Sequence, residues 1–327
     1  MYFRVLAVWG GIGITALAVA GDSQDANNEQ PQDEVVVAAP AAPPAVPSFS
    51  PAVPASAIAV RGRPEQVRLR SSVALVRDQS DGVLMLAHSI DEQRPIASIT
   101  KLMTAIVVLD AAQPFDESIE ITAADRDRLK GSRSRLPIGS VFTRRELLHV
   151  ALAASDNRAA SALARSYPGG QAQFVRAMND KAQQFGMTKT RFVEATGLDR
   201  RNVSTARDLA QLVTELERYP IVRMLSTTAD LTIHDQRHRV SMNFYNTNPY
   251  VRSPNWRVDL SKTGYISEAG NCLLMTSVIN NRPVTVVLLN AWGKMSPYGD
   301  SARIRDWLTR TERQIEKQSQ QVAHASL

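Results

Sequence analysis

Ser98-Ile99-Thr100-Lys101 is the stretch that decides the fold, because it opens an apolar segment with the periodicity of a helix. Apolar residues recur three or four positions apart behind it, at Leu102, Ile106 and Leu109. This spacing predicts a helix over residues 99–112, with the Ser98 hydroxyl and the Lys101 amine on one face and within hydrogen-bond reach. Such a pair can supply a nucleophile and its base, provided that burial and a second nearby cation lower the pKa of Lys101.

A Ser-x-Asn string can add a polar relay to this pair, and the chain contains three such strings. Ser155-Asp156-Asn157 follows an apolar helical stretch at the edge of a helical region, where a loop can face the nucleophile. The other two, Ser241-Met242-Asn243 and Ser253-Pro254-Asn255, lie in strand-rich sequence shortly before Lys262. We therefore assign the relay to Ser155 and Asn157.

Lys262-Thr263-Gly264 continues a strand-like run that begins at Arg257. Alternation along a strand places Lys262 and Gly264 on one face and Thr263 on the other, unless the site lies along the strand edge. Glycine at such an edge lets a substrate backbone lie close to the strand. The alternative is a purely structural lysine on an edge strand, which limits aggregation.

Strand-like sequence lies at both ends of the folded part of the chain, and helix-forming sequence lies between them. An opening hairpin is expected from residues 72–77 and 83–87. Helix-forming residues fill 144–219, with a capping box at Thr205 and Asp208. Later strands are expected at residues 231–233, 258–262, 272–279 and 284–289, followed by an amphipathic helix with Ile304, Trp307 and Leu308. The pattern predicts an α+β fold in which distant parts of the chain close one sheet.

The ends of the chain differ in composition from the part between them. Residues 1–20 contain one cation, Arg4, an apolar run and the sequence Ala18-Val19-Ala20, which predicts an export signal cleaved near Ala20. An uncleaved membrane anchor is the alternative. Residues 21–68 are rich in Pro, Ala and Val and predict an extended, disordered linker. We therefore expect one folded domain over residues 69–312 and a polar tail over residues 313–327.

The formal net charge of +6 is accompanied by a run of cations over residues 126–145. Such a run is usually a solvated face, and the alternative is a basic rim that attracts an anionic polymer. An exported chain whose basic run shows no regular interleaving of aromatic and basic residues is not expected to bind nucleic acid. His234 and His238 are four residues apart, but Asp235-Gln236-Arg237 between them predicts a hairpin turn, so we expect no metal site. Cys272 is the only cysteine and excludes an intrachain disulfide.

Four longer strings extend this pattern, and through them the chain resembles the low-molecular-mass penicillin-binding proteins, the D-alanyl-D-alanine peptidases. The likeness is greatest to the endopeptidases of the penicillin-binding protein 7 type, and it covers about residues 71–310. It implies a β-lactamase/transpeptidase-like α+β fold: an antiparallel sheet flanked by helices, a helical subdomain, and the active site between them. The strings are Ile96-Ala97-Ser98-Ile99-Thr100-Lys101-Leu102-Met103-Thr104, Arg191-Phe192-Val193-Glu194-Ala195-Thr196-Gly197-Leu198, Ser204-Thr205-Ala206-Arg207-Asp208-Leu209 and Lys262-Thr263-Gly264-Tyr265-Ile266-Ser267-Glu268-Ala269-Gly270.

The resemblance implies catalytic roles for three side chains. Ser98 would be acylated by a D-alanyl carbonyl, Lys101 would be its base, and Ser155 would relay the proton to the leaving amine. The backbone N–H groups of Ser98 and Tyr265 would form the oxyanion hole. No cofactor and no metal are implied.

The same resemblance implies substrate-binding roles for the remaining motif residues. Asn157 would hold the substrate amide or Lys101, and Lys262 would tune the proton network and hold a carboxylate. Thr263 would position the substrate, with Gly264 and Tyr265 beside it on the strand. The expected partners are therefore peptidoglycan and β-lactam antibiotics.

The expected activity is hydrolysis of D-alanyl crosslinks between peptidoglycan stem peptides, in the periplasm. A D-alanyl-D-alanine carboxypeptidase, a β-lactamase and a catalytically idle wall-binding scaffold are the alternatives. Asp156 departs from the glycine of many such carboxypeptidases and matches class A β-lactamases, but their Glu-x-x-Leu-Asn string is missing from this sequence. The short stretch after Gly264 leaves no room for the C-terminal domain of the membrane-bound carboxypeptidases, so we expect at most a loose association with the membrane or the wall.

Overall fold

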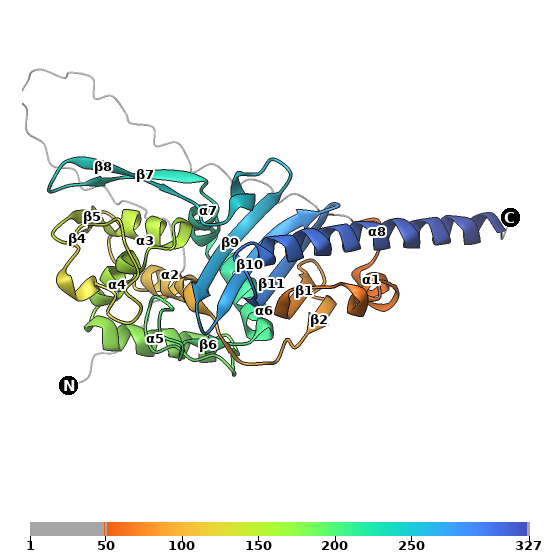
Figure 1. Ribbon diagram of the computed structural model, residues 1–327, viewed down its shortest axis with the longest axis horizontal. Helices are drawn as coiled ribbons and strands as arrows, with labels where there is room; N and C mark the ends of the chain where they lie inside the picture. Colours follow the sequence, from red (N-terminus) through yellow and green to blue (C-terminus); the bar gives the residue numbers. More distant parts are fainter. Residues whose placement is uncertain (1–48, 50, 326–327) are drawn as a thin grey trace, which may run out of the picture. The chain divides into compact units, whose positions relative to one another are not determined.

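The structure, a computed structural model, describes residue 49 and residues 51–325, so the predicted export signal and most of the predicted linker lie outside it. Its main element is a five-stranded sheet in the order β2-β1-β11-β10-β9, with every neighbouring pair antiparallel (Figure 1). These strands are β1 (Ser71–Asp78), β2 (Leu84–His88), β9 (Arg257–Ile266), β10 (Gly270–Ile279) and β11 (Arg282–Ala291). Strands from distant parts of the chain thus form one sheet, and the α+β prediction is confirmed.

Helices cover both faces of the sheet and form a separate helical region beside β9 (Figure 1). They are α1 (Ala55–Arg61), α2 (Lys101–Asp110), α3 (Arg144–Ala153), α4 (Asn157–Arg165), α5 (Gly170–Gln184), α6 (Ala206–Glu215), α7 (Pro220–Ser226) and α8 (Ser296–Ala325). Small two-stranded sheets pair β3 (Arg94–Pro95) with β6 (Val203–Ser204), β4 (Ser118–Glu120) with β5 (Val141–Thr143), and β7 (Asp230–Asp235) with β8 (Val240–Tyr245). Within the described ranges, no helix is both long enough and apolar enough to cross a membrane.

The central strands read as nearly continuous apolar runs because both of their faces are covered. In β1, Val73 and Leu75 join the larger core, which also contains buried side chains of α2 to α6. Ala74 and Val76 point the other way and join a smaller core with α1 and α8. Alternation along a strand accounts for this division. The larger core carries the helical region and therefore fixes its position against the sheet.

The beginning of the folded part lies earlier than the sequence predicted. Residues 51–68 were assigned to the disordered linker, and this is wrong for α1, whose Ile58 is fully buried in the smaller core. Trp307 of α8 donates a hydrogen bond from Nε1 to the Gly62 carbonyl at 2.6 Å. A composition rich in proline and alanine predicts an extended chain, but it does not reveal an apolar surface elsewhere in the fold that can bind the segment.

The predicted polar tail is also wrong in part, because α8 continues through it as far as Ala325. Ile304 and Leu308 are buried on the sheet, and Ile315 continues the same face of the helix with 6% exposure. Positions i, i+4 and i+11 share one side of a helix. The helical face that covers the sheet therefore extends into the segment whose composition is mainly polar.

Arg282, the first residue of β11, ties the early segment, β1 and α8 together from inside the protein. Its side chain is 1% exposed, pairs with Asp78 and donates to the Val53 carbonyl. It also pairs with Glu312 through an Nε to Oε1 contact of 2.9 Å. Three segments far apart in the sequence thus depend on one guanidinium.

We predict that Arg282→Met lowers the free energy of unfolding by about 3–5 kcal/mol, because it leaves the buried Asp78 carboxylate unpaired. Urea denaturation measures the loss. Arg313→Met removes an exposed cation from α8 and is the matched control, with an expected change within about 0.5 kcal/mol. Equal losses in the two variants would contradict the prediction.

Candidate active site

The nucleophile pair lies where a 3₁₀ turn, Ala97–Thr100, leads into α2. Ala97 has a positive φ of 47°, and this sharp turn presents the Ser98 hydroxyl at the edge of the sheet. Lys101 begins the helix, and its Nζ lies 2.8 Å from Ser98 Oγ. The i, i+3 spacing thus brings the hydroxyl and the amine into direct contact.

Lys101 is buried and has two more acceptors besides Ser98. Its side chain is 1% exposed, and its Nζ lies 2.6 Å from Asn157 Oδ1 and 2.7 Å from the Thr196 carbonyl. Burial lowers the pKa of the Lys101 amine to about 8, although the carboxylates of Glu194 and Asp156 act in the opposite direction. A neutral amine still donates to Asn157 and Thr196, and its lone pair is then free to accept the Ser98 proton.

The Ser155-Asp156-Asn157 string forms the junction between α3 and α4. Ser155 has a left-handed φ of 59°, a conformation that costs about 1–3 kcal/mol in a non-glycine residue and is found at functional sites. Asp156 is the N-cap of α4 and accepts a hydrogen bond from the Ala159 N–H at 3.0 Å. Capping accounts for an aspartate at this position. It also holds the two neighbours of Asp156 in place, so that Asn157 contacts Lys101 and Ser155 contacts Lys262.

Lys262 lies on β9, the edge strand of the sheet, on the side of the helical region. Its Nζ donates to Ser155 Oγ at 2.7 Å and to the Thr263 carbonyl at 2.9 Å. Burial and the positive charge of Lys101 hold the pKa of Lys262 well below its usual range. The alternative of a solvent-exposed structural lysine is wrong, because the Lys262 side chain is only 1% exposed.

The rest of the β9 motif brings the strand against the nucleophile. A Cβ added at Gly264 would lie 2.8 Å from the Ser98 backbone nitrogen, so this position requires glycine. Thr263 Oγ1 lies 2.6 Å from Thr247 Oγ1, and the Tyr265 side chain is 65% exposed. The structure therefore brings together all the residues that the sequence assigned to the site.

Sequence reasoning assigned no role to the loop between α5 and β6, although this loop supplies the Thr196 carbonyl to Lys101. The Glu194 carboxylate holds this loop by accepting from the backbone N–H groups of Thr196 and Gly197, each at 2.6 Å. Gly197 has a φ of 85°, and a Cβ there would lie 1.9 Å from the Ala97 carbonyl oxygen. The sequence signal was the family-like string at residues 191–198, and such a string does not say which part of the fold the loop approaches.

Ser132 is a second contact that sequence reasoning missed. Its hydroxyl accepts a hydrogen bond from Asn157 Nδ2 at 2.9 Å, which turns Asn157 Oδ1 toward Lys101. Asp127 holds the Ser132 loop by accepting from three backbone N–H groups, including that of Ser132 at 2.7 Å. The orientation of the Asn157 amide thus depends on the basic segment 126–145.

That basic segment is mostly a solvated face, with two exceptions. Arg144 is fully buried and pairs with Glu117 at 2.6 Å. Lys130 pairs with Glu268 at 2.5 Å, which links the segment to the turn between β9 and β10. Lys130 is exposed despite this pair, and the other exposed cations are Arg126, Arg128, Arg133, Arg135 and Arg145.

A groove with a volume of about 1210 Å³ opens over the site. Ser98, Ser155 and Asn157 line it from the helical region, and residues 263–265 line it from β9. Within the described residues, no cluster of His, Cys, Asp or Glu side chains could hold a metal ion.

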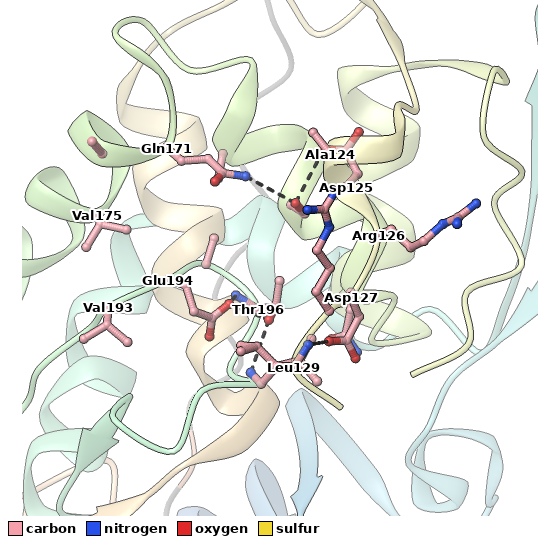
Figure 2. Close-up of a pocket in the computed structure, with 17 residues that line it drawn as sticks. Ala124, Asp125, Arg126, Asp127, Leu129, Gln171, Val175, Val193, Glu194 and Thr196 are labelled. Atoms are coloured by element: carbon pink, nitrogen blue, oxygen red, sulfur yellow. Dashed lines mark hydrogen bonds between the residues drawn. The ribbon is translucent and has the colours of Figure 1, made fainter. Parts of the chain in front are cut away.

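A second cavity of about 480 Å³ shares only Asn157 with the groove. Figure 2 shows Val193 and Glu194 on one side of it and residues 124–129 on the other. Its lining contains three carboxylates, those of Asp125, Asp127 and Glu194. The lining of the groove contains none.

Comparison with known sequences gives one consistent group of relatives. A family profile described as D-alanyl-D-alanine carboxypeptidase matches residues 60–293. The chain is 45% identical over 247 residues to a D-alanyl-D-alanine endopeptidase of Pseudomonas aeruginosa, which covers 76% of this chain and 80% of that protein. It is 43% identical over 243 residues to the Escherichia coli D-alanyl-D-alanine endopeptidase, which covers 74% of this chain and 78% of that protein.

Solved structures agree with this grouping. The Streptomyces K15 DD-transpeptidase is 25% identical, has a TM-score of 0.68, and covers 73% of this chain and 97% of that chain. Penicillin-binding protein D2 of Listeria monocytogenes in its ampicillin-bound form is 27% identical and has a TM-score of 0.64. The match covers 73% of this chain and 97% of that chain. The chain that carries this serine, these two lysines and this edge strand therefore belongs to the D-alanyl-D-alanine carboxypeptidase family of serine hydrolases, the low-molecular-mass penicillin-binding proteins.

Proposed function

We propose that this chain is a D-alanyl-D-alanine endopeptidase, which hydrolyses the D-alanyl crosslinks of peptidoglycan through an acyl-enzyme on Ser98. The observation that carries the serine mechanism is the 2.8 Å contact between Ser98 Oγ and Lys101 Nζ, because this lysine is buried. The relatives at 45% and 43% identity are named endopeptidases, whereas a Bacillus subtilis relative at 30% identity is named a carboxypeptidase. A carboxypeptidase is the second candidate, since both reactions break the same type of bond.

Acylation begins when the neutral Lys101 amine takes the proton of the Ser98 hydroxyl. Ser98 Oγ then attacks the D-alanyl carbonyl carbon, and the carbonyl oxygen becomes an oxyanion. The backbone N–H groups of Ser98 and Tyr265 stabilise it, and each such donor contributes about 2.7–4 kcal/mol to the transition state. The closeness of Gly264 to the Ser98 nitrogen supports this pairing of the two donors.

Collapse of the tetrahedral intermediate breaks the carbon–nitrogen bond, and the leaving amine needs a proton. Ser155 supplies it, because its hydroxyl is hydrogen bonded to the Lys262 amine at 2.7 Å. Proton transfer from Lys101 through this pair returns both lysines to their starting states. Asn157 and Thr263 hold the substrate on either side of the scissile bond.

Hydrolysis of the acyl-enzyme completes the reaction. Water attacks the ester carbonyl with Lys101 as base, the ester bond to Ser98 breaks, and Ser98 recovers its proton. The Glu194 carboxylate is occupied by the backbone N–H groups of Thr196 and Gly197, so it is not free to activate a water as a β-lactamase base would. This favours a peptidase that is acylated by β-lactams and releases them slowly.

The substrate and the sequence together favour action in the periplasm, after removal of residues 1–20 near Ala20. Peptidoglycan and β-lactam antibiotics are the proposed partners, and penicillin-binding protein D2 of Listeria monocytogenes has been solved in ampicillin-bound and cefotaxime-bound forms. Attachment to the membrane or the wall is expected to be loose.

The rate of Ser98 acylation by a fluorescent penicillin should rise with pH and level off above the Lys101 pKa of about 8. The sign follows because only the unprotonated amine can accept the Ser98 proton, and that form predominates above the pKa. Asp156→Asn keeps a good N-cap but removes a carboxylate that raises the pKa of Lys101, so the midpoint should move to lower pH. A rate that falls across this range would contradict the assignment of Lys101 as base.

Purified crosslinked muropeptide dimers should be converted to monomers by the wild-type protein and left intact by Ser98→Ala. Uncrosslinked pentapeptide monomers are incubated in parallel, since a carboxypeptidase would release free D-alanine from them. Chromatography of the products measures both dimer cleavage and D-alanine release. Release of D-alanine with the dimers untouched would assign the protein as a carboxypeptidase. Rapid turnover of bound penicillin would favour the β-lactamase alternative.

A further inference from the structure

The groove continues well beyond the reacting atoms. From residues 263–265 on β9 it passes Asn271 on β10 and Asn290 on β11 and reaches Ser72 on β1. These strands are neighbours in the sheet, so the distance covers three strand spacings, or about 14 Å. A departing D-alanine would fill only the first part of this length, because the residue contributes at most about 3.6 Å of chain.

The continuation lies on the side of the leaving group. In the proposed mechanism the leaving amine is protonated by Ser155, which is hydrogen bonded to Lys262, and Thr263 follows Lys262 on the strand. Thr263 contacts Thr247 at 2.6 Å, and the Tyr298 hydroxyl of α8 donates to the Thr247 carbonyl at 3.2 Å. These contacts lead from the scissile bond to the beginning of α8, which forms the far wall of the groove.

The far part of the groove is cationic. Arg70 and Lys294 line it, both are exposed, and the lining contains no carboxylate. In the part of the chain that the structure describes, neither side chain takes part in an ion pair or a hydrogen bond; the contacts of Arg70 with Asp300 come from its backbone N–H. Two cations without partners in a groove favour an anionic ligand.

An aromatic side chain stands beside these cations. Trp292 also lines the groove and is 83% exposed. An exposed indole at a groove gives a flat apolar surface, which suits the aliphatic part of a ligand rather than its charged end. The far part of the groove thus combines cations with one apolar face.

We infer that Arg70 and Lys294 are specificity-determining residues that bind carboxylates of the departing stem peptide, with Trp292 against its aliphatic part. The inference rests on the proposed endopeptidase function. A crosslink leaves as a whole stem peptide with its own carboxylates, whereas a carboxypeptidase releases a single D-alanine. The two cations therefore distinguish a crosslink from a free stem peptide end.

The test uses the double variant Arg70→Ala, Lys294→Ala of the full chain and compares two substrates. The kcat/KM for crosslinked dimers should fall by at least about tenfold, mainly through KM, because two charge-assisted contacts are lost. Acylation by penicillin, which has no departing stem peptide, should change by less than about twofold. Added salt should weaken dimer cleavage by the wild type more than by the variant.

Arg313→Ala removes an exposed cation of α8 that does not line the groove, and it is the matched control. Lys294→Glu should reduce dimer cleavage further than Lys294→Ala, because it repels the stem carboxylates. Unchanged dimer cleavage in the double variant, or an equal fall in penicillin acylation, would overturn the inference. Failure of the wild type itself to cleave dimers would instead overturn the proposed function on which the inference rests.

Discussion

The burial of two lysines close to one another is the constraint on which the site depends. Lys101 and Lys262 are each 1% exposed, and the charge of Lys101 adds to the effect of burial on the pKa of Lys262. A buried ammonium is costly unless its protons are accepted, and two such charges also repel each other. Keeping one amine neutral relieves both costs. Burial alone lowers the pKa of Lys101 to about 8, so the base that Ser98 requires follows from where Lys101 is placed.

This placement requires acceptors from several parts of the fold. Asn157 at the start of α4 and the Thr196 carbonyl both accept from Lys101, while Ser155 accepts from Lys262. Two of these acceptors are themselves held: Asn157 by Ser132, and the Thr196 loop by the Glu194 carboxylate. The sheet edge and the helical region can meet this closely only because glycine occupies positions 197 and 264.

The two cavities beside the site differ in charge, although both touch Asn157. The lining of the smaller one contains three carboxylates and two arginines, and the lining of the groove contains cations without carboxylates. The groove also depends on α8, because Tyr298 at the beginning of that helix contacts the Thr247 carbonyl. The helix is fixed to the sheet by buried residues and by the Arg282 ion pairs, so the stability of this face and the shape of the groove are linked.

The sequence by itself determined the elements whose signals are local. Runs of apolar, β-prone residues indicated the strands, and the spacing of Ser98 and Lys101 placed a hydroxyl and an amine on one face. Thr205 was identified as a cap, and it accepts from the Asp208 N–H at 3.0 Å. Only the tertiary structure decided which backbone atoms complete the site. Thr196 lies 95 residues from Lys101, and no periodicity relates positions so far apart. The same reason explains why α1 was assigned to a linker, since its order comes from the apolar surface of the sheet and α8 rather than from its own composition.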